Sequence, residues 1–188
     1  MPGIFHMKRV ILFVDGNNFY YGLKYIYGDT RSLSDFNFEK LGESLSNNGE
    51  VLKIFYYNAP LHINENQDKY WRQQRFFDRL KKEEKIELRL SRLQKRKIKG
   101  TDKHYYVVKG DDIHLASEMV KEAYENSFDI AVLVSGDGDF VPAIKIIQNK
   151  AKEVHNAYFK QSMSWDLKQT CDKSIRLTKE LLDRCFDQ

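Results

Sequence analysis

Short apolar runs alternate along the chain with longer segments in which apolar residues recur every three or four positions. The runs at 9–14, 51–57 and 130–134 are rich in β-branched or aromatic residues and end at turn-forming residues, which is typical of strands buried on both faces. The run at 153–159 predicts a further strand. The periodic segments predict helices at about 19–27, 37–46, 65–82, 111–125, 140–147, 162–168 and 177–186.

These elements follow one another as strand, helix, strand, helix, with short connections. Such an order predicts an α/β fold, a three-layer α/β/α sandwich whose mostly parallel central sheet is Rossmann-like and carries helices on both faces. There is no internal repeat, linker or low-complexity stretch, so residues 8–188 are expected to form a single domain. Residues 1–7 are expected to be an N-terminal extension or an expression scar outside the fold.

The middle of the chain departs from this pattern. Residues 86–90 alternate between apolar and charged side chains, which indicates a strand nearer the edge of the sheet. Residues 91–102 form the most basic stretch, with Gly100 at an expected turn. Residues 104–108 are expected to extend the edge strand or to pair with it. An exposed edge of this kind is also a candidate contact with a second copy of the chain, as a homodimer.

Composition narrows the class of protein. Of the 188 residues, 41% are hydrophobic and 31% are charged, as in globular proteins. No apolar run approaches the ~18 residues that a membrane helix needs, so no membrane association is expected. Cys171 and Cys185 have no CxxC or zinc-type spacing, which favours a reduced, cytoplasmic protein. The glycine-rich phosphate loops GxGxxG and GxxxxGK[ST] are absent.

Positive charge is concentrated in one segment. Residues 71–109 contain 14 Lys and Arg against 5 Asp and Glu, a net charge of +9, whereas the rest of the chain has 17 against 22 and a net charge of −5. A basic segment on a mildly acidic body is expected for a protein that binds a polyanion. The alternative is a solvated helix face held by salt bridges.

Aspartates follow the predicted strands at three places. Asp15 ends the first strand, Asp137 and Asp139 follow the strand at 130–134, and Asp111 and Asp112 begin a helix. If the first strand and the 130–134 strand are neighbours, these carboxylates converge at one edge of the sheet. Each like-charged pair at ~4 Å costs about 4 kcal/mol at an effective dielectric constant near 20. Either some carboxyls are protonated or a hard cation such as Mg²⁺ or Mn²⁺ lies between them.

Helix capping is the alternative role for these aspartates, because Asp is a common N-cap. Asp111, Asp112 and Asp139 each stand where a helix is expected to begin. Asp137 is harder to explain in this way if Asp139 already serves the helix start. Asp15 can also end its strand in an ordinary turn, so the functional interpretation depends on the convergence of all three places.

Five motifs together resemble the NYN domains, and in particular the LabA-like branch of the PIN-like nuclease superfamily. They are DGNN at 15–18, YYNAP at 56–60, VKGDDIHLASEM at 108–119, DIAVLVSGDGDF at 129–140 and SMSWDLKQTCD at 162–172. The resemblance covers about 8–182 and implies a PIN-like fold. It also implies a metal-dependent ribonuclease whose catalytic and metal-ligating residues are Asp15, Asp112, Asp137 and Asp139. Asp111 takes a place that is more often apolar in these proteins and ranks below Asp112.

Asn18 and Ser135 match polar positions that line the pocket of the family. Backbone N–H groups at 138–140 are expected to take a phosphate oxygen. Trp71, Tyr105 and Tyr106 offer stacking faces for bases, with core packing as their alternative role. The expected substrate-binding residues are Asn17, Asn18, Ser135, Lys109, Arg96, Lys97 and Lys99.

The function predicted from these residues is endoribonuclease activity that depends on Mg²⁺ or Mn²⁺ and acts on single-stranded or structured RNA. Two alternatives remain open. The domain can be a PIN-like module that binds RNA, a nucleotide or a protein without cleaving it. It can also hydrolyse a small phosphorylated metabolite, although an extended basic segment is not needed for such a substrate. The dependence of binding on salt separates a long polyanion from a small ligand.

Overall fold

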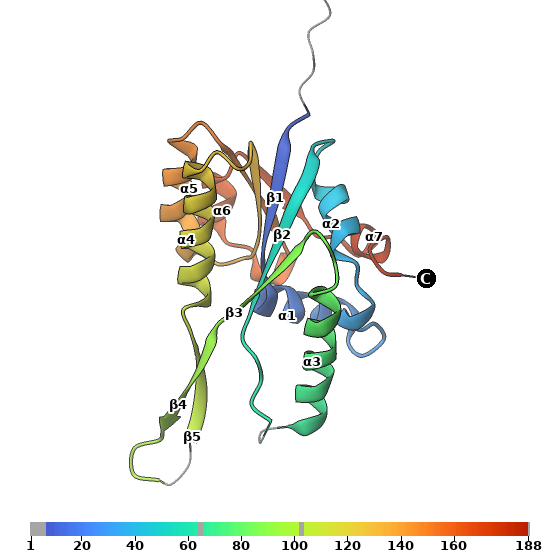
Figure 1. Ribbon diagram of the computed structural model, residues 1–188, viewed down its shortest axis with the longest axis vertical. Coiled ribbons are helices and arrows are strands. Elements are labelled where there is room, and N and C mark those ends of the chain that lie inside the picture. Colours follow the sequence, from blue (N-terminus) through green and yellow to red (C-terminus); the bar gives the residue numbers. More distant parts are fainter. Residues whose placement is uncertain (1–6, 64–65, 102–103, 188) are drawn as a thin grey trace, which may run out of the picture.

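The computed structural model describes residues 7–63, 66–101 and 104–187. Within these residues, a six-stranded sheet has the order β3-β2-β1-β6-β7-β8, and all of its neighbouring strands are parallel (Figure 1). The extension is expected at 1–7, and its residues 1–6 lie outside the described residues. The strands of this sheet are β1 (Arg9–Asp15), β2 (Glu50–Asn58), β3 (Ile86–Leu90), β6 (Ile130–Val134), β7 (Glu153–Tyr158) and β8 (Lys173–Arg176).

Helices cover both faces of the sheet. Residues of α1 (Gly16–Tyr27), α2 (Phe38–Leu45), α3 (Gln67–Leu80) and α7 (Lys179–Asp183) share one hydrophobic cluster with the sheet. Residues of α4 (Asp111–Tyr124), α5 (Val141–Gln148) and α6 (Trp165–Thr170) form a second cluster on the opposite face. The predicted α/β/α sandwich is therefore confirmed. Among the helices of the described part of the chain, none is long and apolar enough to cross a membrane.

The continuous apolar run of β1 is explained by these two clusters. Val10, Leu12 and Val14 point into the cluster that contains α1, and Ile11 and Phe13 point into the one that contains α4. All five side chains are at most 2% exposed. Because successive strand residues point to opposite faces, a central strand covered on both sides must be apolar at every position.

The structure corrects two expectations about the strands. Residues 104–108 do not pair with β3. Instead, β5 (His104–Lys109) pairs antiparallel with β4 (Arg92–Lys97), which lies in the basic stretch at 91–102, where the sequence predicts no strand. The C-terminal region also contains β8, which lies between the helices expected at 162–168 and 177–186 and is not predicted, and only the short α7 follows it in the described chain. The prediction that β3 lies at the edge of the main sheet is confirmed.

The β4–β5 hairpin projects from the body of the protein. Figure 1 shows it beyond α4, on the same side of the molecule as α3 and as the end of β1 that leads into α1. The hairpin connects β3 directly to α4, so its two strands leave and re-enter the body near the carboxyl edge of the sheet. Arg92 and Lys109 are therefore at the base of the hairpin, near the carboxyl edge of the sheet, whereas Arg96 and Lys97 are at its far end.

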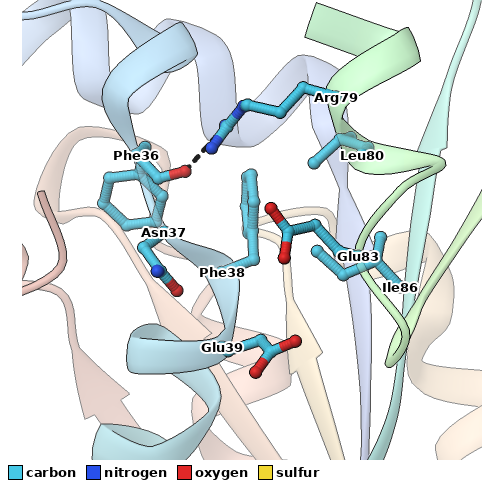
Figure 2. Close-up of a pocket in the computed structure, with 8 residues that line it drawn as sticks. All are labelled: Phe36, Asn37, Phe38, Glu39, Arg79, Leu80, Glu83 and Ile86. Atoms are coloured by element: carbon cyan, nitrogen blue, oxygen red, sulfur yellow. Dashed lines mark hydrogen bonds between the residues drawn. The ribbon is translucent and has the colours of Figure 1, made fainter. Parts of the chain in front are cut away.

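The hollow between α2 and α3 is a packing seam. Figure 2 shows Arg79 reaching from α3 to the main chain that precedes α2, where its guanidinium donates a 2.8 Å hydrogen bond to the Phe36 carbonyl. Phe36 and Phe38 fill the space beside it, with their ring centroids 5.1 Å apart. The volume open to a water-sized sphere is about 0 Å³, so this hollow has no room for a ligand. Arg79 consequently serves the fold and is not part of a basic surface.

Candidate acidic site

The candidate site lies where the strand order of the sheet reverses. From β1 the chain proceeds to β2 and β3 on one side, while β6, β7 and β8 extend on the other. In β1 and β6, Val14 is paired with Val134, which brings Asp15 beside Ser135 at the carboxyl ends of both strands. Ligands of open α/β sheets bind at such a switch point. The expectation that the first strand and the 130–134 strand are neighbours is confirmed.

Asp15 is fixed by two hydrogen bonds. The Asn18 amide donates to Asp15 Oδ1 at 3.0 Å, which caps α1, and the Ser135 hydroxyl donates to Asp15 Oδ2 at 2.9 Å. Burial raises the pKa of the Asp15 carboxyl, and the charges of Asp111 and Asp137 raise it further, although the two hydrogen bonds oppose this. The Asp15 carboxyl is thus fixed in position where its ionised form is less stable than in water.

Asp137 caps the short 3-10 helix η2 (Gly138–Phe140), so the prediction that Asp139 serves this helix start is wrong. The Asp139 amide donates to Asp137 Oδ1 at 2.9 Å, and the Asp137 amide in turn donates to Ser135 Oγ at 3.2 Å. The Asp139 N–H is therefore already occupied and is not open to a phosphate oxygen. Asp139 itself is exposed, which leaves its carboxylate available to a ligand.

Asp111 and Asp112 occupy the first turn of α4 without capping it. The cap is Gly110, whose φ of 88° lies in the left-handed region that glycine adopts without strain, and no side chain bonds the helix end. Partial desolvation and the charges of Asp111, Asp15, Asp137 and Asp139 raise the pKa of Asp112 to about 6. The charges of the other four carboxyls thus all act on Asp112, and Asp111, which also acts on Asp15, belongs to the same cluster.

The donor set fits a hard divalent cation. Five carboxylates supply only oxygen ligands, as Mg²⁺ and Mn²⁺ prefer. A cation would offset both the burial and the neighbouring negative charges that raise the pKa values of Asp15 and Asp112. Among the described residues, however, no three His, Cys, Asp or Glu side chains are already gathered closely enough to hold a metal ion. The carboxylates are therefore close enough for their charges to act on Asp112, but they do not form a complete set of metal ligands.

Several polar residues that support the site are not predicted by the sequence. The buried Asn156 side chain on β7 donates to the Ser135 carbonyl at 2.8 Å and to the Leu133 carbonyl at 3.2 Å. The Ser162 hydroxyl donates to Asn18 Oδ1 at 3.2 Å. A Cβ on Gly138 would lie 3.0 Å from Ser164 Oγ. The 162–172 motif is part of the resemblance to the family, but β7 (EVHNAY) contains other polar residues, so the sequence does not single out Asn156.

Asp166, on the first turn of α6, also lies near the loop that follows β6. Its Oδ2 lies 3.9 Å from the position that a Gly138 Cβ would take. Asp166 is exposed, so a sixth carboxylate stands at the rim of the cluster. The sequence motif that contains it matches the family, but nothing in the sequence gives it a role.

The predicted substrate-binding residues divide into two groups. Ser135 is 0% exposed, and its hydroxyl is bonded to Asp15 and Asp137, so it positions the carboxylates and does not contact a substrate. Asn17 and Asn18 are half-buried on the first turn of α1, beside the cluster. The remaining residues, which belong to the β4–β5 hairpin and the turn that joins its strands, are Arg96, Lys97, Lys99 and Lys109.

The basic segment does not act as one continuous surface. Arg89 forms ion pairs with Glu118 at 2.9 Å and with Glu87 at 2.6 Å. Its charge is therefore used in contacts within the protein, as that of Arg79 is. On the hairpin, Arg96, Lys97 and Lys99 are exposed. The position of the Lys109 side chain lies outside what the structure describes, as do the side chains of Tyr105 and Tyr106. Trp71 is 52% exposed on α3, so core packing is excluded for this ring.

Comparisons with known proteins place the chain in a family. A protein of unknown function from Vibrio parahaemolyticus RIMD 2210633 has the same fold, with a TM-score of 0.62, 21% sequence identity, and coverage of 96% of this chain and 98% of that one. No curated protein matches. Residues 9–178 match the family model of the NYN domain. With this match extending from β1 to the residues just after β8, the chain belongs to the NYN domain family, a PIN-like family of nucleases.

Proposed function

We propose that this protein is an endoribonuclease that depends on Mg²⁺ or Mn²⁺. The observation that supports this proposal is the gathering of five carboxylates at the switch point of the sheet, with pKa values raised for Asp15 and Asp112. Structural roles account for only part of this cluster, since Asp111, Asp112 and Asp139 cap no helix. Membership of a nuclease family agrees with a hydrolytic role.

In this proposal the protein contributes fixed oxygen ligands. Asp15 is held by Ser135 and Asn18, and Asp137 is held against η2, so both carboxylates keep their positions without substrate. Asp112 and Asp139, at the exposed rim, complete the set of ligands. The chemistry that a bound divalent cation supplies is a nucleophilic water at neutral pH and neutralisation of charge on the phosphodiester. Preorganised ligands of this kind avoid reorganisation during the reaction.

The hairpin is proposed to guide the RNA strand. Arg96, Lys97 and Lys99 are exposed on an arm that extends past the carboxyl edge of the sheet (Figure 1). Each phosphate that a protein neutralises adds about −0.7 to the slope of log affinity against log salt for a single strand. Three phosphate contacts from these residues would therefore give a slope of about −2, which a small phosphorylated ligand would not produce.

Cleavage of RNA in the presence and absence of metal tests the proposal. Purified protein is incubated with end-labelled single-stranded and hairpin RNAs in Mn²⁺, Mg²⁺ or EDTA, over a range of salt concentrations. Internal cleavage that requires a divalent cation is expected. No cleavage of any RNA in either metal would contradict the proposal. Salt-sensitive RNA binding without cleavage would instead support the non-catalytic module.

Metal binding is expected to be visible in the melting temperature without any substrate. A ligand at 100 times its dissociation constant stabilises the folded state by about 2.7 kcal/mol, which corresponds to roughly 5–10 °C for a chain of this size. Mn²⁺ should raise the melting temperature of the wild type by this order. Asp112→Asn should remove most of the shift, and Asp29→Asn, an exposed aspartate after α1, should retain it. An equal shift in all three proteins would place the metal elsewhere.

One observation favours the non-catalytic alternative. In the part of the chain that the structure describes, the carboxylates do not yet stand as a three-ligand group. If they never close around a cation, the same surface and hairpin can hold RNA without cutting it. The melting experiment separates the two functions, because the binding module predicts no metal-dependent shift.

A further inference from the structure

A second hollow lies directly beside the acidic site. It is open to solvent and lies between α1 and the segment around η3 (Lys160–Ser162), and its volume is about 300 Å³, the lower end of the range for ligand pockets. The acidic cluster does not line it. Its lining residues are Asn18, Tyr21, Gly22, Tyr25, Gln161 and Ser162.

Two tyrosines of this pocket are exposed to an unusual degree. Tyr21 is 68% exposed and Tyr25 is 73% exposed, whereas Phe19 and Leu23 on the other side of α1 are buried in the core. Residues four apart lie on one face of a helix, so the two rings stand one turn from each other. Neither ring is needed to cover the core. Together they form an aromatic wall that faces solvent.

The remaining walls of the pocket are small or polar. A Cβ on Gly22 would lie 2.2 Å from the Phe159 ring, so glycine is required for α1 to pack on this ring. The Gln161 amide lies 3.5 Å from the Gly22 carbonyl. Asn18 and Gln161 carry amides that can both donate and accept hydrogen bonds, as the edge of a nucleobase requires.

The pocket and the carboxylates share residues. The backbone N–H of Asn18 donates to Asp15 Oδ1, while the side-chain oxygen of Asn18 accepts from the Ser162 hydroxyl at the wall of the pocket. Ser162 also touches the loop after β6, since its carbonyl is the nearest atom to the position of a Gly136 Cβ. A single ligand can therefore extend from the pocket to the acidic cluster.

We propose that this pocket binds one unpaired nucleobase of the RNA, next to the phosphodiester at the acidic cluster. The inference rests on the proposed ribonuclease function and specifies its substrate as single-stranded. A base in a helix has both faces stacked, so only an unpaired base can lie against Tyr21 and Tyr25 and reach the amides of Asn18 and Gln161. The site then selects its cleavage position by the nucleotide that enters the pocket.

Fluorescence of 2-aminopurine tests this assignment without cleavage. The probe is placed at successive positions of a single-stranded RNA, and binding to the full chain is measured in EDTA by anisotropy and by quenching. Stacking on a tyrosine should quench the probe in the wild type. Tyr21→Ala and Tyr25→Ala should each remove the quenching and weaken binding by about 10-fold, within the range for base–aromatic stacking. Tyr21→Phe and Tyr25→Phe should keep both.

Tyr124→Ala is the matched control, because Tyr124 is also exposed, at 60%, but ends α4 at the opposite end from Asp111 and Asp112. Unchanged quenching and affinity in the two alanine variants, with RNA still cleaved, would overturn the pocket assignment and leave the ribonuclease function standing. An equal loss in Tyr124→Ala would also overturn it. Failure of the wild type to bind or cleave any RNA would refute the ribonuclease proposal, and the pocket assignment with it.

Discussion

Replacing Asp15 with asparagine should reduce RNA cleavage by about 10³-fold, the scale observed when one preorganised electrostatic group is removed from an active site. The substitution preserves the shape of the side chain and its role as a helix cap, because Asn and Asp are equivalent at that position. What it removes is the negative charge held between Ser135 and Asn18. Cleavage rates are measured beside Asp29→Asn, which changes an exposed aspartate outside the cluster. Full activity in Asp15→Asn would exclude this carboxylate from the reaction.

The same substitution should stabilise the protein in EDTA at neutral pH. Burial and neighbouring charges raise the pKa of Asp15 in the folded state above that of the unfolded chain. A carboxyl with a raised pKa destabilises the fold above its unfolded pKa, and stability returns as the pH falls through the folded pKa. Asp15→Asn removes this penalty, so its melting temperature should exceed that of the wild type at pH 7. A lower value would mean that the hydrogen bonds to the carboxylate outweigh its unfavourable charge.

Gly136→Ala should produce the largest loss of stability of any single methyl group added near the site. The new Cβ would lie 1.7 Å from the Ser162 carbonyl oxygen and 2.7 Å from its carbonyl carbon. These are backbone atoms, so relief requires the loop after β6 or the segment at η3 to move. Overpacking costs typically 1–3 kcal/mol, and this clash belongs at or above the upper end. A fall of roughly 10 °C in melting temperature is expected for a chain of this length.

Gly138→Ala adds a methyl group to the same loop with a milder steric overlap, so it serves as the comparison for Gly136→Ala. Its Cβ would meet Ser164 Oγ at 3.0 Å, a smaller overlap than at Gly136, but this hydroxyl caps α6 by accepting a hydrogen bond from the Leu167 backbone N–H at 3.3 Å. We therefore expect a loss of stability of about 1 kcal/mol, the typical effect of losing a helix cap. If both variants melt at the same temperature, the tight contact between the two loops does not exist in solution.

The sequence predicts the centre of the sheet better than its periphery. The strands β1 and β6 are apolar at nearly every position because helices cover both of their faces, and this leaves an unambiguous pattern. Strand β8 is the edge strand of the main sheet and has only four residues, KSIR. It therefore contains no apolar run from which a strand can be predicted. Strand β4 is RLQKRK, which has no apolar pattern, and it is defined by its main-chain pairing with β5 in the hairpin.

The candidate site, too, is only partly predictable from the sequence. Its aspartates are predicted because they directly follow buried strands or begin a helix, which are local properties of the sequence. Their hydrogen bonds are not predictable in this way. The bond between Ser135 and Asp15 joins residues 120 positions apart, and the contact of Ser162 with Asn18 spans 144 positions. Both depend on the register of distant segments, as does the exposure of Tyr21 and Tyr25.

The strand order has a consequence for synthesis of the protein. β1 lies near the middle of the sheet, yet Val10 pairs with Ile130, which is translated 120 residues later. Until β6 leaves the ribosome, one side of β1 has no partner within the sheet, and such an unpaired edge is prone to aggregation. Closure over this separation is slow compared with helix formation. A growing chain therefore has no assembled acidic cluster, so the proposed nuclease stays inactive until its sheet is closed.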